Sequence, residues 1–276
     1  FARILVGFCA GIYSSALVAK AFLLKEKAIG KFTSFGSFGW AFGILVAAVL
    51  TMYWQIFLFS SLMFFVSFAF SLAVTFRDDV KMAVPLFPRD VIKGSLPAYL
   101  TILIRHTGAC SVWVIFPLYL HVNLGASLFE IGILYALNPM GQFITMQFTD
   151  RFKSTKLIPF GLFLSILSFI GLALVTTFWF AVIPWVILSV GWACLYVGSL
   201  KFVMERNIEK ATSTGLLNST LNISSIAGAL IGGAVAWQFG RVANIILAAA
   251  MCLIAFILFF TLMGVAKRGS PANLTV

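Results

Sequence analysis

The sequence predicts an all-α membrane protein built as a polytopic helical bundle. Of its 276 residues, 62% are hydrophobic and 10% are charged, whereas a soluble domain is about 45–50% apolar and about 25% charged. Long apolar stretches recur along the chain, and a helix needs about 20 such residues to cross a bilayer. The short alternating segments typical of a transmembrane β-barrel do not occur in the sequence. These observations exclude a water-soluble fold.

Nine apolar stretches are predicted to cross the membrane. The first, residues 2–19, is apolar except for Arg3; the second, 33–51, is rich in glycine, and the third, 54–75, is rich in phenylalanine. The remaining six lie at 97–120, 128–148, 157–178, 180–203, 213–236 and 243–264. No charge marks the boundary between the sixth and seventh, so that boundary rests on length alone.

The longest polar interruption, residues 76–96, divides the spans into three and six. It contains two prolines and charges of both signs, as expected of a connector between bundles. We therefore predict three parts: the remainder of an N-terminal bundle at 1–76, a cytoplasmic connector at 77–95, and a C-terminal six-helix bundle at 96–276.

The basic residues predict the orientation of the chain. The formal net charge is +11, and sixteen of the 19 Lys and Arg residues fall at the ends of spans on one side. By the positive-inside rule this side is cytoplasmic, which places the C-terminus in the cytoplasm of a multi-pass plasma-membrane protein. Topology and attraction to the lipid bilayer explain the charge, and a nucleic-acid partner is not expected because no basic surface carries interleaved stacking aromatics.

The beginning of the sequence suggests a fragment. Residues 1–19 lack the basic n-region and the small-residue cleavage site of a signal peptide. The charge pattern requires the first span to run from outside to inside, which is unusual for a chain of nine spans. We expect an N-terminally truncated sequence that lacks three helices.

Two arginines and one histidine are predicted inside spans. Each arginine costs about 2.5–3.5 kcal/mol at a helix centre, so Arg3 and Arg105 should face a water-filled cavity or a partner, or else snorkel. Arg105 lies deeper and is the better cavity candidate. His106 shares a helix face with Cys110 and Trp113, and it is either a hydrogen-bonded core residue or a proton carrier.

Two other spans carry polar or aromatic faces. In 128–148 the polar side chains recur at helical spacing, and Asn138 and Gln142 are equally compatible with interhelical hydrogen bonds and with substrate contact. Pro139 interrupts that helix and is a candidate hinge. In 180–203, Trp192 and Tyr196 lie too deep for the membrane interface, which favours a cavity lining that stacks on an apolar or ring-shaped ligand.

Three pairs of glycines spaced four residues apart predict close helix contacts. They are Gly7 with Gly11, Gly39 with Gly43, and Gly228 with Gly232.

Five stretches carry a family resemblance. They are Arg3 to Gly11 (RILVGFCAG), Gly36 to Gly43 (GSFGWAFG), Arg105 to Tyr119, Asp150 to Leu157 (DRFKSTKL), and Glu205 to Asn218. In this order they resemble the fourth, fifth and seventh helices, the loop between the eighth and ninth, and the loop into the eleventh helix of the major facilitator superfamily. The resemblance implies the fold of these secondary transporters, with nine of the twelve helices present.

The resemblance also implies a gate on the cytoplasmic side. Asp150 and Arg151 would pair with neighbouring helix ends and hold that side closed. The candidate gating or conformational residues are therefore Arg3, Asp150, Arg151 and Pro139. The candidate substrate-binding residues are Arg105, His106, Trp113, Asn138, Gln142, Trp192 and Tyr196.

The predicted function is secondary transport of a small organic solute by alternating access. No carboxylate is placed in mid-membrane, so proton coupling would need His106 or residues outside this sequence. Organic anions, amphipathic drugs and sugars remain open as substrates. A non-transporting sensor and an intramembrane lipid-modifying enzyme are alternatives, although the sequence contains neither a His-Glu-x-x-His nor a Gly-x-Ser-x-Gly motif. We expect no cofactor or metal, and a monomer.

Overall fold

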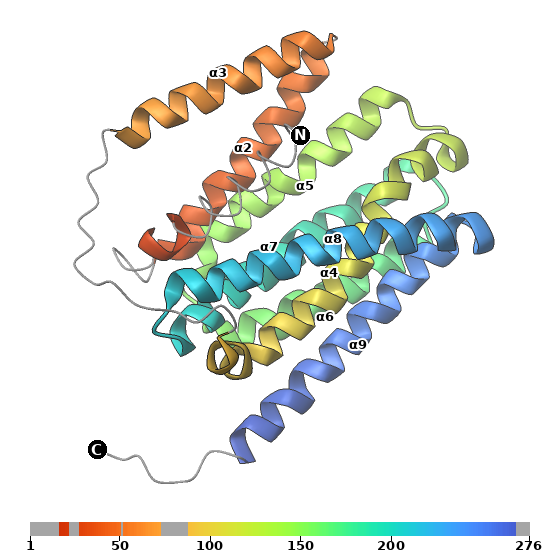
Figure 1. Ribbon diagram of the computed structural model, residues 1–276. Helices are drawn as coiled ribbons and strands as arrows, with labels where there is room; N and C mark the ends of the chain where they lie inside the picture. Colours follow the sequence, from red (N-terminus) through yellow and green to blue (C-terminus); the bar gives the residue numbers. More distant parts are fainter. Residues whose placement is uncertain (1–16, 22–27, 51, 73–87, 269–276) are drawn as a thin grey trace.

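The computed structural model describes residues 17–21, 28–50, 52–72 and 88–268, and every regular element in these ranges is a helix (Figure 1). Residues 17–21 form a short helical stretch. The eight long helices are α2 (Ile29–Val49), α3 (Tyr53–Leu72), α4 (Arg89–Leu124), α5 (Leu128–Thr149), α6 (Ser154–Ala173), α7 (Phe178–Arg206), α8 (Lys210–Phe239) and α9 (Arg241–Arg268). The predicted all-α fold class is confirmed.

Seven of these helices are long and apolar enough to cross a membrane: α2, α3, α4, α6, α7, α8 and α9. Helix α5 has the length, with 22 residues, but its polar stripe lowers its hydropathy. The first predicted span lies mostly outside the described residues, as do Arg3, the pair Gly7 and Gly11, and most of the predicted connector.

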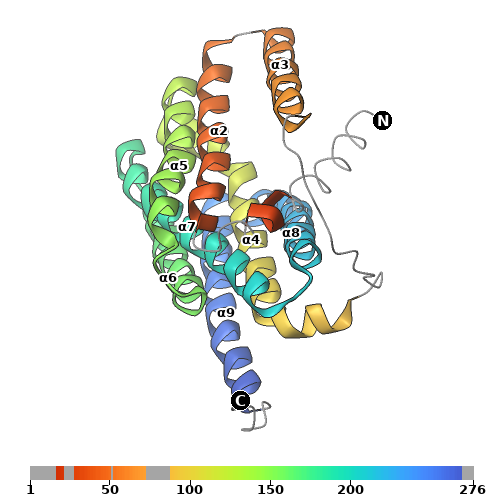
Figure 2. The same cartoon turned by 90° about the vertical axis from the view of Figure 1, so that its left-hand side faces the viewer.

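Helix α4 begins earlier than predicted. It starts at Arg89, directly after Pro88, rather than at residue 97. The prediction ended the helix where charges begin, but a helix can continue beyond the apolar layer. Figure 2 shows these first turns lying at an angle to the rest of α4. At its other end, Gly125 adopts φ 67°, a left-handed conformation that glycine reaches without a steric penalty.

The start of α5 follows its sequence signature. The Ser127 hydroxyl accepts a hydrogen bond from the Glu130 backbone N–H at 3.2 Å, and the Ser127 N–H donates to the Glu130 carboxylate at 2.8 Å. This capping box satisfies two backbone donors at the N-terminal end of the helix.

Helices α4 to α9 pack against one another, with α6 along α7, α4 along α8 and α9, and α5 against α7. Glycine makes the α4–α8 contact possible, because a Cβ atom on Gly228 would lie 2.5 Å from the carbonyl oxygen of Thr107. Gly232 meets Ser111 in the same way, so the prediction for this pair is confirmed.

The prediction for Gly39 and Gly43 is wrong for the described residues. A Cβ atom built on either glycine would meet nothing within 4 Å. Both lie on the face of α2 that points away from α5, and spacing alone does not reveal which face of a helix is packed.

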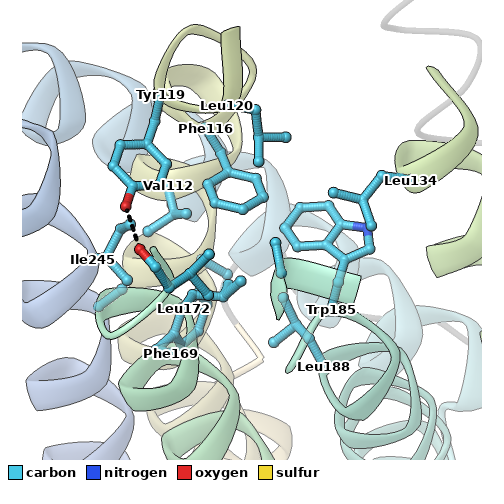
Figure 3. Close-up of a cluster of buried hydrophobic side chains, with 14 of the residues drawn as sticks. Val112, Phe116, Tyr119, Leu120, Leu134, Phe169, Leu172, Trp185, Leu188 and Ile245 are labelled. Atoms are coloured by element: carbon cyan, nitrogen blue, oxygen red, sulfur yellow. Dashed lines mark hydrogen bonds between the residues drawn. The ribbon is translucent and has the colours of Figure 1, made fainter. Parts of the chain in front are cut away.

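Two apolar cores fill the bundle. One surrounds Ile102, Leu162 and Phe202. The other, around Phe116 and Trp185, is shown in Figure 3, where the Tyr119 hydroxyl donates to the Val175 carbonyl at 3.2 Å. The burial of such large side chains indicates that the helices are closely packed in both cores.

Helix α2 runs beside α5 in both views (Figures 1 and 2). Helix α3 has no buried residue among those described and presents phenylalanine side chains on its surface, as expected of a helix that faces lipid. The division of the chain into an N-terminal bundle, a connector and a C-terminal bundle stays a prediction.

Candidate functional site

Arg105 lies inside the bundle and is 2% exposed. Its Nε and Nη2 atoms donate to the Ser165 hydroxyl of α6 at 3.1 and 3.0 Å. Its guanidinium lies over the Trp192 ring of α7, 4.9 Å from the centroid. The side chain therefore has partners within the bundle and does not snorkel.

His106, Trp192 and Tyr196 form one stack of rings between α4 and α7. The His106 and Trp192 centroids are 4.7 Å apart with planes 20° apart, and Trp192 stacks on Tyr196 at 5.4 Å and 13°. All three side chains are half-buried. His106 Nε2 lies 3.4 Å from the Cys110 sulfur, and its buried Nδ1 has no hydrogen-bond partner among the described residues. The structure thus brings together four of the predicted substrate-binding residues, since Arg105 touches the same Trp192.

Trp113 belongs to a second aromatic group, nearer the C-terminal end of α4. Its ring contacts Trp185 at 4.9 Å, Tyr135 at 5.0 Å and Trp40 of α2 at 5.7 Å. The Tyr135 hydroxyl donates to the Trp113 carbonyl at 3.2 Å. Trp113 lies about two helical turns beyond His106 on α4 and belongs to a different ring group from Trp192.

Asn138 and Gln142 hold α5 to its two neighbours. Gln142 donates to the Asn138 side-chain oxygen at 2.5 Å, and Asn138 donates to the Trp185 carbonyl of α7 at 3.4 Å. The Ser37 hydroxyl of α2 donates to Gln142 at 3.3 Å. Both residues are buried, so these contacts match the interhelical hydrogen-bond interpretation. Helix α5 continues through Pro139.

Asp150 contacts a neighbouring helix end. Its carboxylate accepts hydrogen bonds from the backbone N–H groups of Gly30 at 2.7 Å and Lys31 at 3.1 Å. Both donors lie in the first turn of α2, where N–H groups lack partners within the helix and the helix dipole favours negative charge. A Cβ atom on Gly30 would collide with the Thr149 side chain, so this approach requires glycine.

Arg151 is exposed, and its guanidinium lies 5.7 Å from the centroid of the Phe148 ring. It therefore lies next to the Asp150 contact without taking part in it.

The family comparison agrees with this arrangement. Residues 1–206 and 98–275 match the profile of the Major Facilitator Superfamily, and together they cover nearly the whole chain. The chain belongs to the major facilitator superfamily. A search of curated proteins gave no match. The overlap of the two matches over 98–206 is consistent with a fold made of internal repeats, as in this family of multi-pass secondary transporters.

In this superfamily member the described charges are unevenly placed along the helices. The described carboxylates lie at or near helix ends: Asp90, Glu130, Asp150, Glu205 and Glu209. Within the described ranges none of them lies within ion-pair distance of Arg105. The cation beside Trp192 is thus uncompensated by a described anion.

Sequence reasoning missed Lys201, Ser165 and Gly30. Lys201 counted as one of many cytoplasmic charges, yet it is 8% exposed and donates to two carbonyls of the turn after α5. Its position inside an apolar helix could have signalled this. Ser165 and Gly30 gave no signal, because their importance comes from residues distant in sequence.

A groove of about 300 Å³ lies elsewhere, between the N-terminal parts of α5 and α7. Its lining is apolar except for Glu130 and includes none of the candidate residues. Such a lining suits lipid acyl chains.

Proposed function

We propose that this superfamily member moves a small organic solute across the plasma membrane by alternating access, and that the solute contacts the stack of His106, Trp192 and Tyr196. One observation carries the proposal: half-buried stacked rings lie deep between α4 and α7, beside a buried guanidinium. Tyrosine and tryptophan ordinarily sit at the membrane interface. Ring faces at mid-membrane suit a solute that contains a ring of its own.

The charge of Arg105 supports a solute class. Arg105 has no anionic partner among the residues that the structure describes, and in a low-dielectric interior such a cation raises the local potential over several ångströms. This disfavours cationic solutes and favours organic anions or uncharged ring compounds such as sugars. Because Arg105 already donates to Ser165, it acts through its field and through Trp192 rather than as an exposed ligand.

We further propose that Asp150 closes the cytoplasmic side by holding the first turn of α2. Separation of α2 from α5 would break its two hydrogen bonds. Arg151 and Pro139 are proposed to assist this movement, and Arg3 keeps its predicted gating role outside the described residues. Trp113, Asn138 and Gln142 would shape the outer wall of the site.

The remaining features of the proposal follow from the sequence. The protein would work as a monomer with a cytoplasmic C-terminus, and the domain division would be 1–76, 77–95 and 96–276. If transport is proton-coupled, His106 is the candidate carrier, because it lies in the ring stack and its Nδ1 is unpartnered among the described residues.

The test is uptake into proteoliposomes that contain the full-length protein. The probes are radiolabelled benzoate, radiolabelled glucose and the aromatic cation ethidium. We expect saturable uptake of benzoate or glucose. Trp192→Ala removes a ring face that the solute would contact. One such contact is worth about 0.5–1.5 kcal/mol, so uptake at low solute concentration should fall by up to about tenfold.

Trp237→Ala is the matched control, since that tryptophan is 91% exposed on α8 and should leave uptake unchanged. Uptake of ethidium alone, or benzoate or glucose uptake that survives Trp192→Ala intact, would contradict the proposal.

A further inference from the structure

Lys201 is a buried cation that the transport site above does not use. It lies on the cytoplasmic part of α7 and is 8% exposed. Its Nζ donates to the backbone carbonyls of Phe152 at 2.7 Å and Asp150 at 3.3 Å. These carbonyls belong to the turn that joins α5 to α6, just beyond the negative end of the α5 dipole, where a cation is favoured.

A second contact ties the same turn to α7. The Ser154 hydroxyl, at the start of α6, donates to the Glu205 carboxylate at 2.7 Å, and Ser154 is 2% exposed. The turn is therefore fixed to the cytoplasmic end of α7 at two places, one turn of helix apart.

The turn also carries the contact with α2. Asp150 presents its carbonyl to Lys201 and its carboxylate to the N–H groups of Gly30 and Lys31. Asp150 thus accepts a hydrogen bond from α7 through its main chain and hydrogen bonds from α2 through its side chain. A displacement of Lys201 changes the position from which the carboxylate reaches α2.

The other relevant feature of α7 is the ring stack. Trp192 and Tyr196 lie on the same continuous helix as Lys201. Lys201 lies nine residues after Trp192 on this helix, a rise of about 13.5 Å. A helix transmits a shift or rotation over this length without bending much.

We propose that Lys201 is a positioning residue that couples the solute-contacting face of α7 to the Asp150 contact with α2. When α7 moves, the turn between α5 and α6 moves with it through Lys201 and Ser154. The Asp150 carboxylate then no longer reaches the N–H groups in the first turn of α2. This inference rests on the proposed role of Asp150 in closing the cytoplasmic side.

The experiment measures how often α2 separates from α5, and it needs no known solute. Ser34→Cys in the full-length protein, with native cysteines replaced by alanine, is the reporter, because Ser34 is 0% exposed and accepts a hydrogen bond from Gln147 at 2.6 Å. The probe is a charged maleimide, and the readout is its labelling rate in detergent. Ser34 does not contact Lys201, so a local packing role for Lys201 would not change this rate.

We expect Lys201→Met to raise the labelling rate by about tenfold, since it removes hydrogen bonds from a charged donor. Lys201→Arg keeps a cationic donor and should label slowly. Lys156→Met removes an exposed lysine of the same surface and is the matched control. Asp150→Asn should label as fast as Lys201→Met, and the double variant should label no faster than either single one.

Each result decides between the two proposals. Slow labelling in Asp150→Asn overturns the closing role of Asp150. Fast labelling in Asp150→Asn with slow labelling in Lys201→Met overturns the coupling role alone. If Lys201→Met does not fold, Ser154→Ala removes the second tie and should raise the rate by about threefold, and an unchanged rate there overturns the coupling.

Discussion

Truncating Ser165 should destabilise the protein more than removing the buried charge of Arg105. Ser165 is the hydrogen-bond acceptor for Nε and Nη2 of Arg105. In Ser165→Ala the guanidinium stays buried and loses this acceptor. A hydrogen bond to a charged group contributes about 1.5–3 kcal/mol to stability. Most of this is lost in the variant, because the buried guanidinium cannot hydrogen-bond to water instead.

Arg105→Met has a different balance. It loses the same hydrogen bonds and the contact with Trp192, which is worth about 0.5–2 kcal/mol. It also removes the desolvation cost of a buried ion, which is still several kcal/mol in proteins. Ser165 keeps a partner, because its hydroxyl donates to the Gly161 carbonyl at 2.8 Å. The two effects nearly cancel, so the free energy of unfolding should change by less than about 1 kcal/mol.

The assay is reversible unfolding of the full-length protein in mixed micelles. Ser168→Ala is the control, because that buried hydroxyl donates to a backbone carbonyl of its own helix and has no charged partner. The double variant of Arg105→Met and Ser165→Ala should resemble Arg105→Met. A larger loss in Arg105→Met than in Ser165→Ala would refute the reasoning.

Three further predictions follow from local geometry. Gly228→Ala should lower stability by about 1–3 kcal/mol because its Cβ would meet a carbonyl oxygen of α4, whereas Gly233→Ala meets nothing within 4 Å and should be neutral or slightly stabilising in the same unfolding assay. Ser127→Ala removes the capping box with Glu130 and should cost about 0.5–2 kcal/mol; an unchanged unfolding midpoint would argue against a contribution of this cap. Asp150→Asn should lower the rate of solute transport without changing solute affinity, which initial rates over a range of solute concentrations would show.

Much of the fold was predictable because a helix that crosses lipid needs a run of about 20 apolar residues, which is visible in the sequence. Predicted spans such as 128–148 and 213–236 correspond to α5 (Leu128–Thr149) and α8 (Lys210–Phe239). Boundaries at polar ends were less accurate, as at Arg89, because charge reports where the lipid ends and not where the helix ends.

The candidate site was predictable only in part. Trp192 and Tyr196 were recognisable because tryptophan and tyrosine usually lie at the membrane interface, whereas these two lie deep in a span. Their pairing with His106 could not be read from the sequence, since stacking depends on the rotation of two helices about their axes. For Lys201 the sequence offered one signal, its position within an apolar helix. Its burial could not be read from that signal, because a lysine near a helix end is usually exposed and its acceptors lie in the distant turn between α5 and α6.

The polar face of α5 has a consequence for how the protein is made. Asn138 and Gln142 find their partners on α2, which is synthesised earlier, and on α7, which is synthesised later. Until α7 emerges from the ribosome, the Asn138 amide lacks the α7 carbonyl to which it donates, and entering lipid alone is unfavourable. Helix α5 should therefore stay in contact with protein during insertion. A delay in the synthesis of α7 should delay the entry of α5 into the lipid.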